Sequence, residues 1–148
     1  MKTMLKLLLM SLFLFTTACM PEDDEVTPSA ESVGNVVMSA GGHTFTVTME
    51  QNTTAEAFRA MLPLELEMSE LHGNEKYHNL DRSLPTNTVH PGTIHAGDIM
   101  LYGNNCVVVF YETFSTSYSY SVIGHIADTD HLREALGSGS VTIIFQKQ

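Results

Sequence analysis

Arg82 is the one arginine that falls outside the stretches with a helical or strand pattern, since Arg59 and Arg133 lie in segments that we expect to be helical. A guanidinium on an irregular segment can project over a groove and donate several hydrogen bonds to a bound molecule. It can equally form an ion pair with a nearby carboxylate, such as that of Asp81 or Glu75. Arg82 is therefore a candidate for a catalytic or ligand-binding residue.

Aromatic side chains are concentrated in the second half of the chain. They are Tyr102, Phe110, Tyr111, Phe114, Tyr118 and Tyr120, and Tyr77 precedes them in an irregular segment. Tyrosine combines an apolar ring with a polar tip, which suits a groove that binds a peptide or a small ligand. Alternation along strands would instead bury some of these rings, and we expect Phe110 in the core. We predict a ligand groove between the loop 71–95 and the connection 111–120, lined by Tyr77, Arg82, Tyr111, Phe114 and Tyr118.

The histidine, serine and cysteine patterns favour neither metal nor nucleophilic chemistry. His90 and His95 are five residues apart in a loop, and no closely spaced Cys/His pair or His-Glu-x-x-His motif occurs. Ser115-Thr116-Ser117 lacks the Gly-x-Ser-x-Gly elbow of a serine hydrolase. Cys106 begins an apolar strand pattern, where a cysteine usually acts as a small core hydrophobe. We expect no cofactor and no metal, although a metal site assembled from distant residues stays open.

The first 18 residues have the layout of a secretory signal peptide. Lys2 and Lys6 flank the start of an apolar run that ends near Phe15, shorter than the roughly 20 residues of a membrane-spanning helix. Thr16-Thr17-Ala18-Cys19 then resembles a bacterial lipobox, in which the cysteine is acylated and becomes the mature N-terminus, although Thr16 replaces the usual Leu. We predict a signal peptide at 1–18 and lipidation of Cys19. The alternatives are an ordinary signal peptide with an incidental cysteine, or a buried N-terminal helix.

Residues 19–34 have the composition of a disordered tether, rich in Pro, Ser, Glu and Thr and without aromatic residues. The run Glu22-Asp23-Asp24-Glu25 resembles the acidic export signal that some Gram-negative lineages use to send lipoproteins to the cell surface. The alternative is a solvated linker. We predict a lipid-anchored protein of the cell envelope, at the outer membrane and with surface exposure as the further expectation.

The charge balance disfavours anionic partners. The net charge is −10, and loss of Lys2 and Lys6 with the leader leaves 5 basic against 17 acidic residues, near −12. Nucleic-acid binding needs several phosphate-neutralising cations, so we expect no nucleic-acid partner. We expect membrane attachment through the Cys19 lipid rather than through attraction to anionic headgroups.

The rest of the chain, residues 35–148, is expected to form one mainly β domain. Strand patterns cover 36–40, 43–49, 64–68, 99–102, 106–111, 120–127 and 141–145. Gly41-Gly42 indicates a hairpin, whereas 71–78 and 80–92 are expected to be loops. Short helices are expected at 53–62, with a Thr53–Glu56 capping box, and at 131–136, capped by Thr129 or Asp130.

Short strands with two short helices favour a closed barrel of about eight strands whose ends the helices plug. Any ligand would then use a surface groove or a mouth.

A set of short sequence motifs, in order along the chain, resembles the bacterial cyclophilin-like family. The motifs are Pro63–Met68, Gly73–Tyr77, Leu84-Pro85, Ala96–Tyr102, Val109–Tyr111 and Ile123–Ile126. Each motif is short, but the motifs follow one another in the order and spacing of the family, and together they extend over about residues 35 to 146. The resemblance implies a cyclophilin-type β-barrel, in agreement with the strand pattern.

The resemblance does not carry an activity with it. True cyclophilins isomerise X–Pro bonds with an arginine that disturbs amide resonance, the source of a barrier of about 18–20 kcal/mol. Their hallmark segment places Phe, His and Arg together and then Gln-Gly-Gly, and this chain has no such segment and no Trp. We therefore expect a non-catalytic module that binds a peptide or small ligand. A peptidyl-prolyl isomerase of exported proteins, using Arg82, and a structural role at the cell surface are the alternatives.

Overall fold

The computed structural model describes residues 34–148. The predicted signal peptide 1–18, the predicted lipidation site Cys19 and residues 20–33 of the tether lie outside the described residues. No helix among residues 34–148 has the length and apolar character required to span a bilayer.

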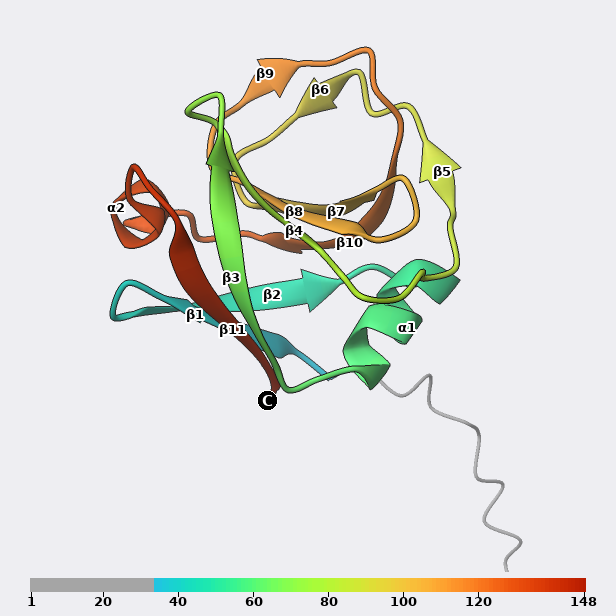
Figure 1. The fold of residues 1–148 in the computed structure, drawn as a ribbon, viewed down its shortest axis with the longest axis horizontal. Coiled ribbons are helices and arrows are strands. Elements are labelled where there is room, and N and C mark those ends of the chain that lie inside the picture. The colour runs from blue at the N-terminus through green and yellow to red at the C-terminus, as the bar shows by residue number, and fades with distance from the viewer. Residues whose placement is uncertain (1–33) are drawn as a thin grey trace, which may run out of the picture.

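Eight strands close into an antiparallel β-barrel (Figure 1). The strands of the described chain are β1 (Val36–Ala40), β2 (His43–Met49), β3 (Leu64–Leu71), β4 (Glu75–Asn79), β5 (Thr88–Val89), β6 (Thr93–Ile94), β7 (Asp98–Tyr102), β8 (Cys106–Phe110), β9 (Phe114–Ser115), β10 (Tyr120–Ile126) and β11 (Val141–Lys147). The order around the barrel is β2-β1-β11-β3-β4-β8-β7-β10, and β10 pairs back onto β2. The expected fold class, a closed barrel of about eight strands, is confirmed.

The β1–β2 hairpin shows why period-two sequences build this barrel. Phe45, Val47 and Met49 are buried, while the threonines between them are exposed. At the turn, Gly41 has a φ of 54°, and a Cβ there would lie 2.3 Å from the Ala135 carbonyl oxygen. The turn therefore requires glycine at position 41 for two reasons: its positive φ, and its close approach to the backbone of Ala135.

Two short helices stand at opposite ends of β2 (Figure 1): α1 (Thr53–Ala60) follows β2, and α2 (Leu132–Leu136) packs near its start. Phe58 of α1 meets Phe145 of β11 edge to face inside the barrel, with ring centroids 5.2 Å apart. Leu132 and Leu136 of α2 belong to the same interior core. The helices therefore fill the barrel ends with apolar side chains.

The predicted helix caps were wrong in both helices. Asn52, not Thr53, caps α1: its Oδ1 accepts from the Ala55 N–H at 2.8 Å, and its Nδ2 donates to the Val122 carbonyl at 2.9 Å. The Asn52 amide therefore caps α1 and also connects it to β10. The Thr53 hydroxyl, at the next position, makes neither contact. In α2 the N-cap is His131, without a side-chain cap, and the Leu132 N–H bonds to a backbone carbonyl instead.

The segment 71–78, expected to be a loop, is instead part of a hairpin. Strand β3 continues to Leu71, and β4 begins at Glu75, with His72 and Gly73 at positive φ in the turn. The sequence hides β4 because its inward-facing position is Lys76, a charged residue that is fully buried in the structure. A buried lysine breaks the apolar alternation by which a strand is recognised.

The barrel carries a second apolar layer on its outer face. Ile94, Met100, Val108, Phe110 and Tyr120 form a cluster separate from the interior core. The β6–β9 ribbon helps to cover them, because Ile94 of β6 pairs with Phe114 of β9 and both belong to or pack against the cluster. This layer explains why β8 reads Cys106-Val107-Val108-Val109-Phe110 without alternation: both of its faces are covered.

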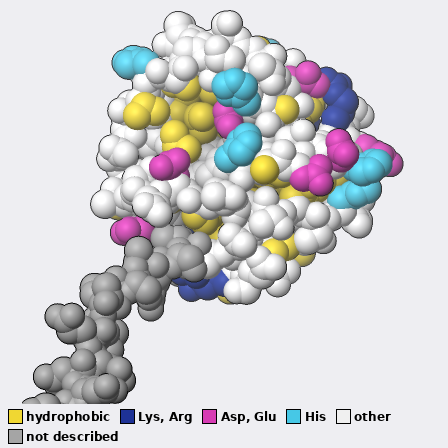
Figure 2. Space-filling view, turned by 180° about the vertical axis from the view of Figure 1, so that it is seen from behind, with side chains coloured by type: hydrophobic (Ala, Val, Ile, Leu, Met, Phe, Trp, Pro, Cys, Tyr) yellow, Lys and Arg dark blue, Asp and Glu magenta, His cyan; other side chains and the backbone are white. Residues whose placement is uncertain are grey.

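Charged residues make up 16% of the chain. On the face drawn in Figure 2, acidic and histidine side chains are scattered, and lysine and arginine side chains lie at the margins. The exposed large apolar side chains among residues 34–148 are Leu71, Val89, Tyr102 and Tyr118.

Candidate ligand-binding site

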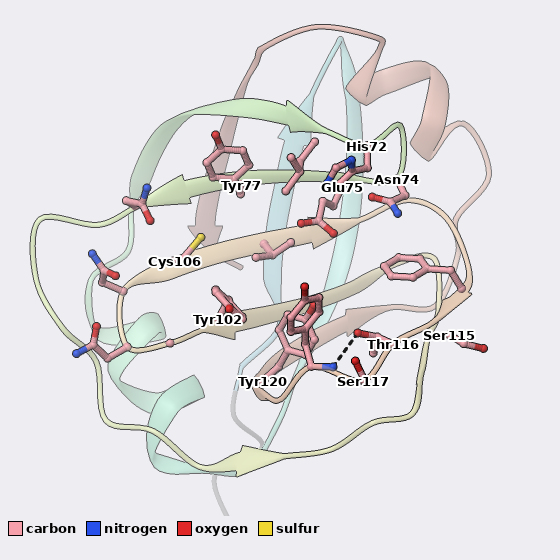
Figure 3. A pocket seen from close by; sticks show the side chains of 18 residues that line it. His72, Asn74, Glu75, Tyr77, Tyr102, Cys106, Ser115, Thr116, Ser117 and Tyr120 are labelled. Atoms are coloured by element: carbon pink, nitrogen blue, oxygen red, sulfur yellow. Dashed lines mark hydrogen bonds between the residues drawn. The ribbon is translucent and has the colours of Figure 1, made fainter.

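A cavity of about 690 Å³ opens on the outer face of β4, β7 and β8 (Figure 3). The strand register places its floor residues side by side: Tyr77 pairs with Val108, and Cys106 pairs with Asn79 on one side and Tyr102 on the other. Because alternate residues of a strand point to the same face, these side chains project together away from the barrel interior. The floor is therefore set by the sheet rather than by a loop.

The connection from β8 to β10 forms one wall of the cavity. Phe114 of β9 packs against Phe110, with ring centroids 5.7 Å apart, so the wall is fixed to the outer apolar cluster. Beyond it, the Thr116 N–H donates to the Gly92 carbonyl at 2.9 Å, and the Thr116 hydroxyl accepts from the Tyr118 N–H at 3.1 Å. These bonds hold Tyr118 at the cavity edge.

Two turns close the two ends of the cavity. The last residue of β3, Leu71, and the turn residues His72 and Asn74 line the cavity. Figure 3 shows His72 and Asn74 beside Glu75 at one end of it. The β7–β8 turn supplies Asn104 and other residues at the far end. The lining thus combines aromatic rings with side-chain amides and hydroxyls, a typical composition for a pocket that orients a small organic molecule.

Three tyrosines form a contiguous aromatic group at the cavity. Tyr102 lies 6.0 Å from Tyr118 at an interplanar angle of 83°, and 5.7 Å from Tyr120 at 55°. The large apolar side chains that are exposed to solvent also lie here. Leu71 (37% exposed), Tyr102 (47%) and Tyr118 (61%) line the cavity, and Val89 (40%) pairs with Tyr120 beside it. Exposed apolar side chains that gather at one hollow are a typical feature of binding surfaces.

Burial shifts the pKa values of several cavity groups. Burial raises the pKa of the Glu75 carboxyl, and His72 and Glu70 act on it with opposite signs. Burial, and then the charge of Glu75, raises the pKa of the Cys106 thiol. A thiol with a raised pKa is a poor nucleophile at neutral pH.

Three of the five predicted groove residues come together in the structure. Tyr77, Phe114 and Tyr118 line the cavity. Arg82 does not: its side chain is 66% exposed, with its Nε 3.7 Å from the Asp81 carboxylate, which is the ion-pair alternative.

Tyr111 also lies outside this cavity. It is buried at the other side of the β3–β4 hairpin, where its hydroxyl donates to the Glu70 carboxylate at 2.7 Å. Tyr111 directly follows β8, and its neighbour Phe110 takes the outward position, so Tyr111 points toward the barrel end. Because neighbouring residues of a strand face opposite sides, the sequence could have predicted that Phe110 and Tyr111 point in opposite directions.

Several lining residues were not predicted. Tyr102 and Cys106 are paired across the β7–β8 hairpin and face outward, so the turn at 103–105 could have identified Tyr102. Cys106, expected in the core, is instead half-buried on the cavity floor. Glu75 and Asn74 carried no signal, because the sequence pattern indicated a loop where β4 lies.

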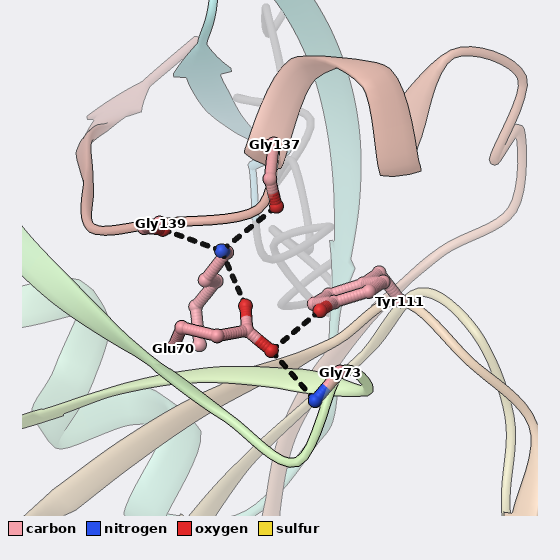
Figure 4. Close-up of polar contacts among 6 residues, drawn as sticks. Glu70, Gly73, Tyr111, Gly137 and Gly139 are labelled. Carbon is pink, nitrogen blue, oxygen red and sulfur yellow. Dashed lines mark hydrogen bonds and ion pairs between the residues drawn. The ribbon is translucent and has the colours of Figure 1, made fainter.

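A second polar cluster holds the barrel end together (Figure 4). Lys76 Nζ donates to the Glu70 carboxylate at 2.5 Å and to the carbonyls of Gly137 and Gly139 at 2.9 and 2.6 Å. Hydrogen bonds from Lys76 and Tyr111 lower the pKa of the Glu70 carboxyl against the opposing effect of burial, which is the largest single influence. All three ammonium protons have an acceptor, so this cluster is a structural connection between β3–β4 and the α2–β11 segment.

Within residues 34–148, no three His, Cys, Asp or Glu side chains are arranged to hold a metal ion. Asp98 lies between two histidines, with its carboxylate 2.9 Å from His125 Nδ1 and 3.9 Å from His95 Nδ1. The same carboxylate also accepts from the His95 backbone N–H at 2.8 Å, which is a local turn contact.

Fold and site together define a small closed β-barrel that presents an aromatic-lined cavity on its outer face. The sequence profile of the cyclophilin-like family matches residues 38–146, and the chain belongs to this family. No curated protein matches the chain.

Proposed function

We propose that this cyclophilin-like domain is a binding module whose outer-face cavity takes a small organic ligand or a peptide segment. The observation that carries the proposal is the grouping of the exposed apolar side chains at one hollow of ligand size. Pockets for small molecules enclose about 300–1,000 Å³ and combine apolar rings with a few polar groups, as this one does.

The positions of the arginines favour binding over prolyl isomerisation. Arg59 Nε donates to the Gly34 carbonyl at 3.3 Å, Arg133 forms an ion pair with Glu112, and Arg82 projects to solvent beside Asp81. None of the three lines the cavity. An isomerase of the cyclophilin type needs a guanidinium beside the prolyl nitrogen, and the cavity has no such group in its lining.

We also propose that the module is attached to the cell envelope through a lipid on Cys19, as the lipobox-like sequence indicates. The described chain begins next to its C-terminus, where the Gln148 N–H donates to the Asn35 carbonyl at 2.9 Å. In Figure 1 this end of the barrel lies opposite the β6–β9 ribbon, which stands beside the cavity wall. Attachment from residue 34 would leave the cavity open to solvent.

A thermal-shift screen tests the binding proposal. A compound that binds the native state raises the melting temperature by mass action. We expect at least one compound from panels of small metabolites and short peptides to do so in the unmodified protein and not in Tyr118→Ala. Arg82→Ala is the matched control, because Arg82 is an exposed side chain outside the cavity. A shift that survives in Tyr118→Ala places the ligand elsewhere and contradicts the proposal.

A prolyl-isomerase assay on a model X–Pro peptide separates binding from catalysis. We expect no acceleration above the uncatalysed rate. Acceleration that Arg82→Ala abolishes would replace the binding proposal with the isomerase. Failure of both the panels and the assay would favour the structural role.

A further inference from the structure

Glu75 is a half-buried carboxylate on the outer face of β4, and it lines the cavity. Within residues 34–148, neither a hydrogen bond nor an ion pair holds this carboxylate, whereas its neighbour Glu70 on β3 has both. Lys76, the adjacent lysine, faces the opposite side of the sheet and is occupied by Glu70 and two carbonyls. Among residues 34–148 the Glu75 carboxylate therefore has no bonded partner, and the cavity residue whose charge favours its ionised form is His72.

A second acceptor lies at the same end of the cavity. The Oδ1 atom of Asn74 is buried and has no hydrogen-bond partner, the one such side-chain atom among the described residues. Figure 3 shows Asn74 beside Glu75 and His72, at the turn that closes this end. A buried acceptor without a donor is destabilising, so a ligand that brings an N–H group would recover this loss.

The tyrosines offer a complementary surface for a cation. Four tyrosine rings line the cavity, and the faces of aromatic rings attract ammonium groups. Burial raises the pKa values of Cys106 and Tyr120, and the charge of the nearby Glu75 carboxylate raises both further. The lining residues include no lysine or arginine that would compete for this position.

We propose that the cavity binds a small organic ligand with a primary ammonium group, held between the Glu75 carboxylate and Asn74 Oδ1 at one end, with its apolar part against the tyrosine rings. This inference rests on the proposed binding function and names its ligand class. A small molecule fits better than a peptide, because β4 is paired on both sides, by β3 and β8, and offers no free edge for an added strand.

Matched probes test each element of this inference by titration calorimetry. Phenethylammonium carries the charge and the N–H donors, phenethyltrimethylammonium keeps the charge without the donors, and 2-phenylethanol keeps the ring without the charge. We expect phenethylammonium to bind about tenfold more tightly than 2-phenylethanol, as a cation on a carboxylate and aromatic faces should. Glu75→Gln should reduce this ratio to about threefold or less.

Two further variants sharpen the assignment. Asn74→Ala should weaken phenethylammonium and leave the trimethylated probe unchanged, because only the primary ammonium donates to Oδ1. Arg82→Ala should alter none of the affinities, since its side chain lies outside the cavity.

The outcomes separate this inference from the function on which it rests. Equal affinity for phenethylammonium and 2-phenylethanol, or a charge preference that Glu75→Gln leaves intact, overturns the ammonium assignment while cavity binding stands. Tighter binding of an acetyl-Ala-Lys-Ala-amide peptide than of phenethylammonium overturns the choice of a small ligand. If no probe and no panel compound binds, both the inference and the proposed function fail.

Discussion

At the residue scale, the chain contains two carboxylates with contrasting environments on the same hairpin. Glu70 is saturated: it accepts from Lys76, from Tyr111 and from the Gly73 N–H. Glu75 faces the cavity with no partner from the described chain. Alternation along the hairpin sends one acid to the barrel end and the other to the outer face. Stability therefore depends on Glu70, and the proposed ligand contact depends on Glu75.

Replacing the buried ammonium should be strongly destabilising. Lys76→Met leaves the Glu70 carboxylate and the carbonyls of Gly137 and Gly139 without their shared donor. Removal of one partner from a buried ion pair typically costs about 3 kcal/mol or more of unfolding free energy. Urea unfolding measures the loss, and Lys147→Met on the exposed end of β11 is the control. A loss below about 1 kcal/mol would show that the cluster does not hold the barrel end.

Tyr111 should be the last tyrosine to ionise. Burial, together with its hydrogen bond to Glu70 and the charge of that group, raises the pKa of Tyr111 to about 12 from the ordinary 10. Because the folded-state pKa lies above the unfolded one, the stability that this hydroxyl contributes is complete below pH 10 and is lost as the pH rises to 12. Phenolate absorbance should show a late-titrating tyrosine that Tyr111→Phe removes. Its persistence in that variant would contradict the assignment.

At the element scale, the barrel depends on β10, which pairs with β2 on one side and β7 on the other. The pairing with β7 shifts register between Val122 and Gly124. A Cβ on Gly124 would lie 2.6 Å from the Thr48 carbonyl oxygen of β2, closer than real contacts allow. Glycine at this position therefore permits the closure of the barrel.

Gly124→Ala should test this closure. The added methyl group must push β2 and β10 apart, and overpacking of this kind costs about 1–3 kcal/mol of unfolding free energy. Gly139→Ala is the control, because a Cβ there meets nothing within 4 Å. Denaturant unfolding of both variants gives the comparison. Equal stability of the two would mean that the strands separate without cost.

The elements differ in how far the sequence predicts them. Alternation in 43–49 and the glycine pair before it predicts the first hairpin, because each face of that strand has a single environment. It fails for β4, whose inward position is Lys76, since a lysine with three acceptors cannot be told from a surface lysine by pattern. Of the cavity, Tyr77, Phe114 and Tyr118 were predicted as aromatic residues in polar surroundings. Glu75 and Asn74 could not be predicted, because their positions depend on the β3–β4 hairpin and on the long-range pairing of β4 with β8.

At the scale of the whole molecule, the chain has a net charge of −10 and forms a cyclophilin-like barrel. Its first described residues and the β6–β9 ribbon beside the cavity lie at different ends of this barrel. Membership in the family establishes the fold and leaves the chemistry to the site. In this chain the arginines lie outside the cavity, and the cavity is lined by tyrosines, side-chain amides and the Glu75 carboxylate. This lining supports the proposed binding function over the isomerase alternative.

The proposed anchor can be tested separately from the site. Labelling of bacteria with a radioactive fatty acid should mark the unmodified protein and not Cys19→Ala, because the thiol is the proposed acylation point. The variant should move from the membrane fraction to the soluble fraction and still bind the compounds found in the screen. Equal labelling of both proteins would contradict lipidation at Cys19.

The most direct test of the binding proposal is amide chemical-shift mapping of the isotope-labelled protein during titration with phenethylammonium or the best compound of the screen. The largest changes should fall in residues 74–79, 102–108 and 114–120, which surround the cavity. Largest changes around Glu70, Tyr111 and Arg133, or near His43 and His131, would place the ligand in another hollow. Either of those patterns, or no change with any compound, would contradict the claim that the outer face of this barrel is a binding site.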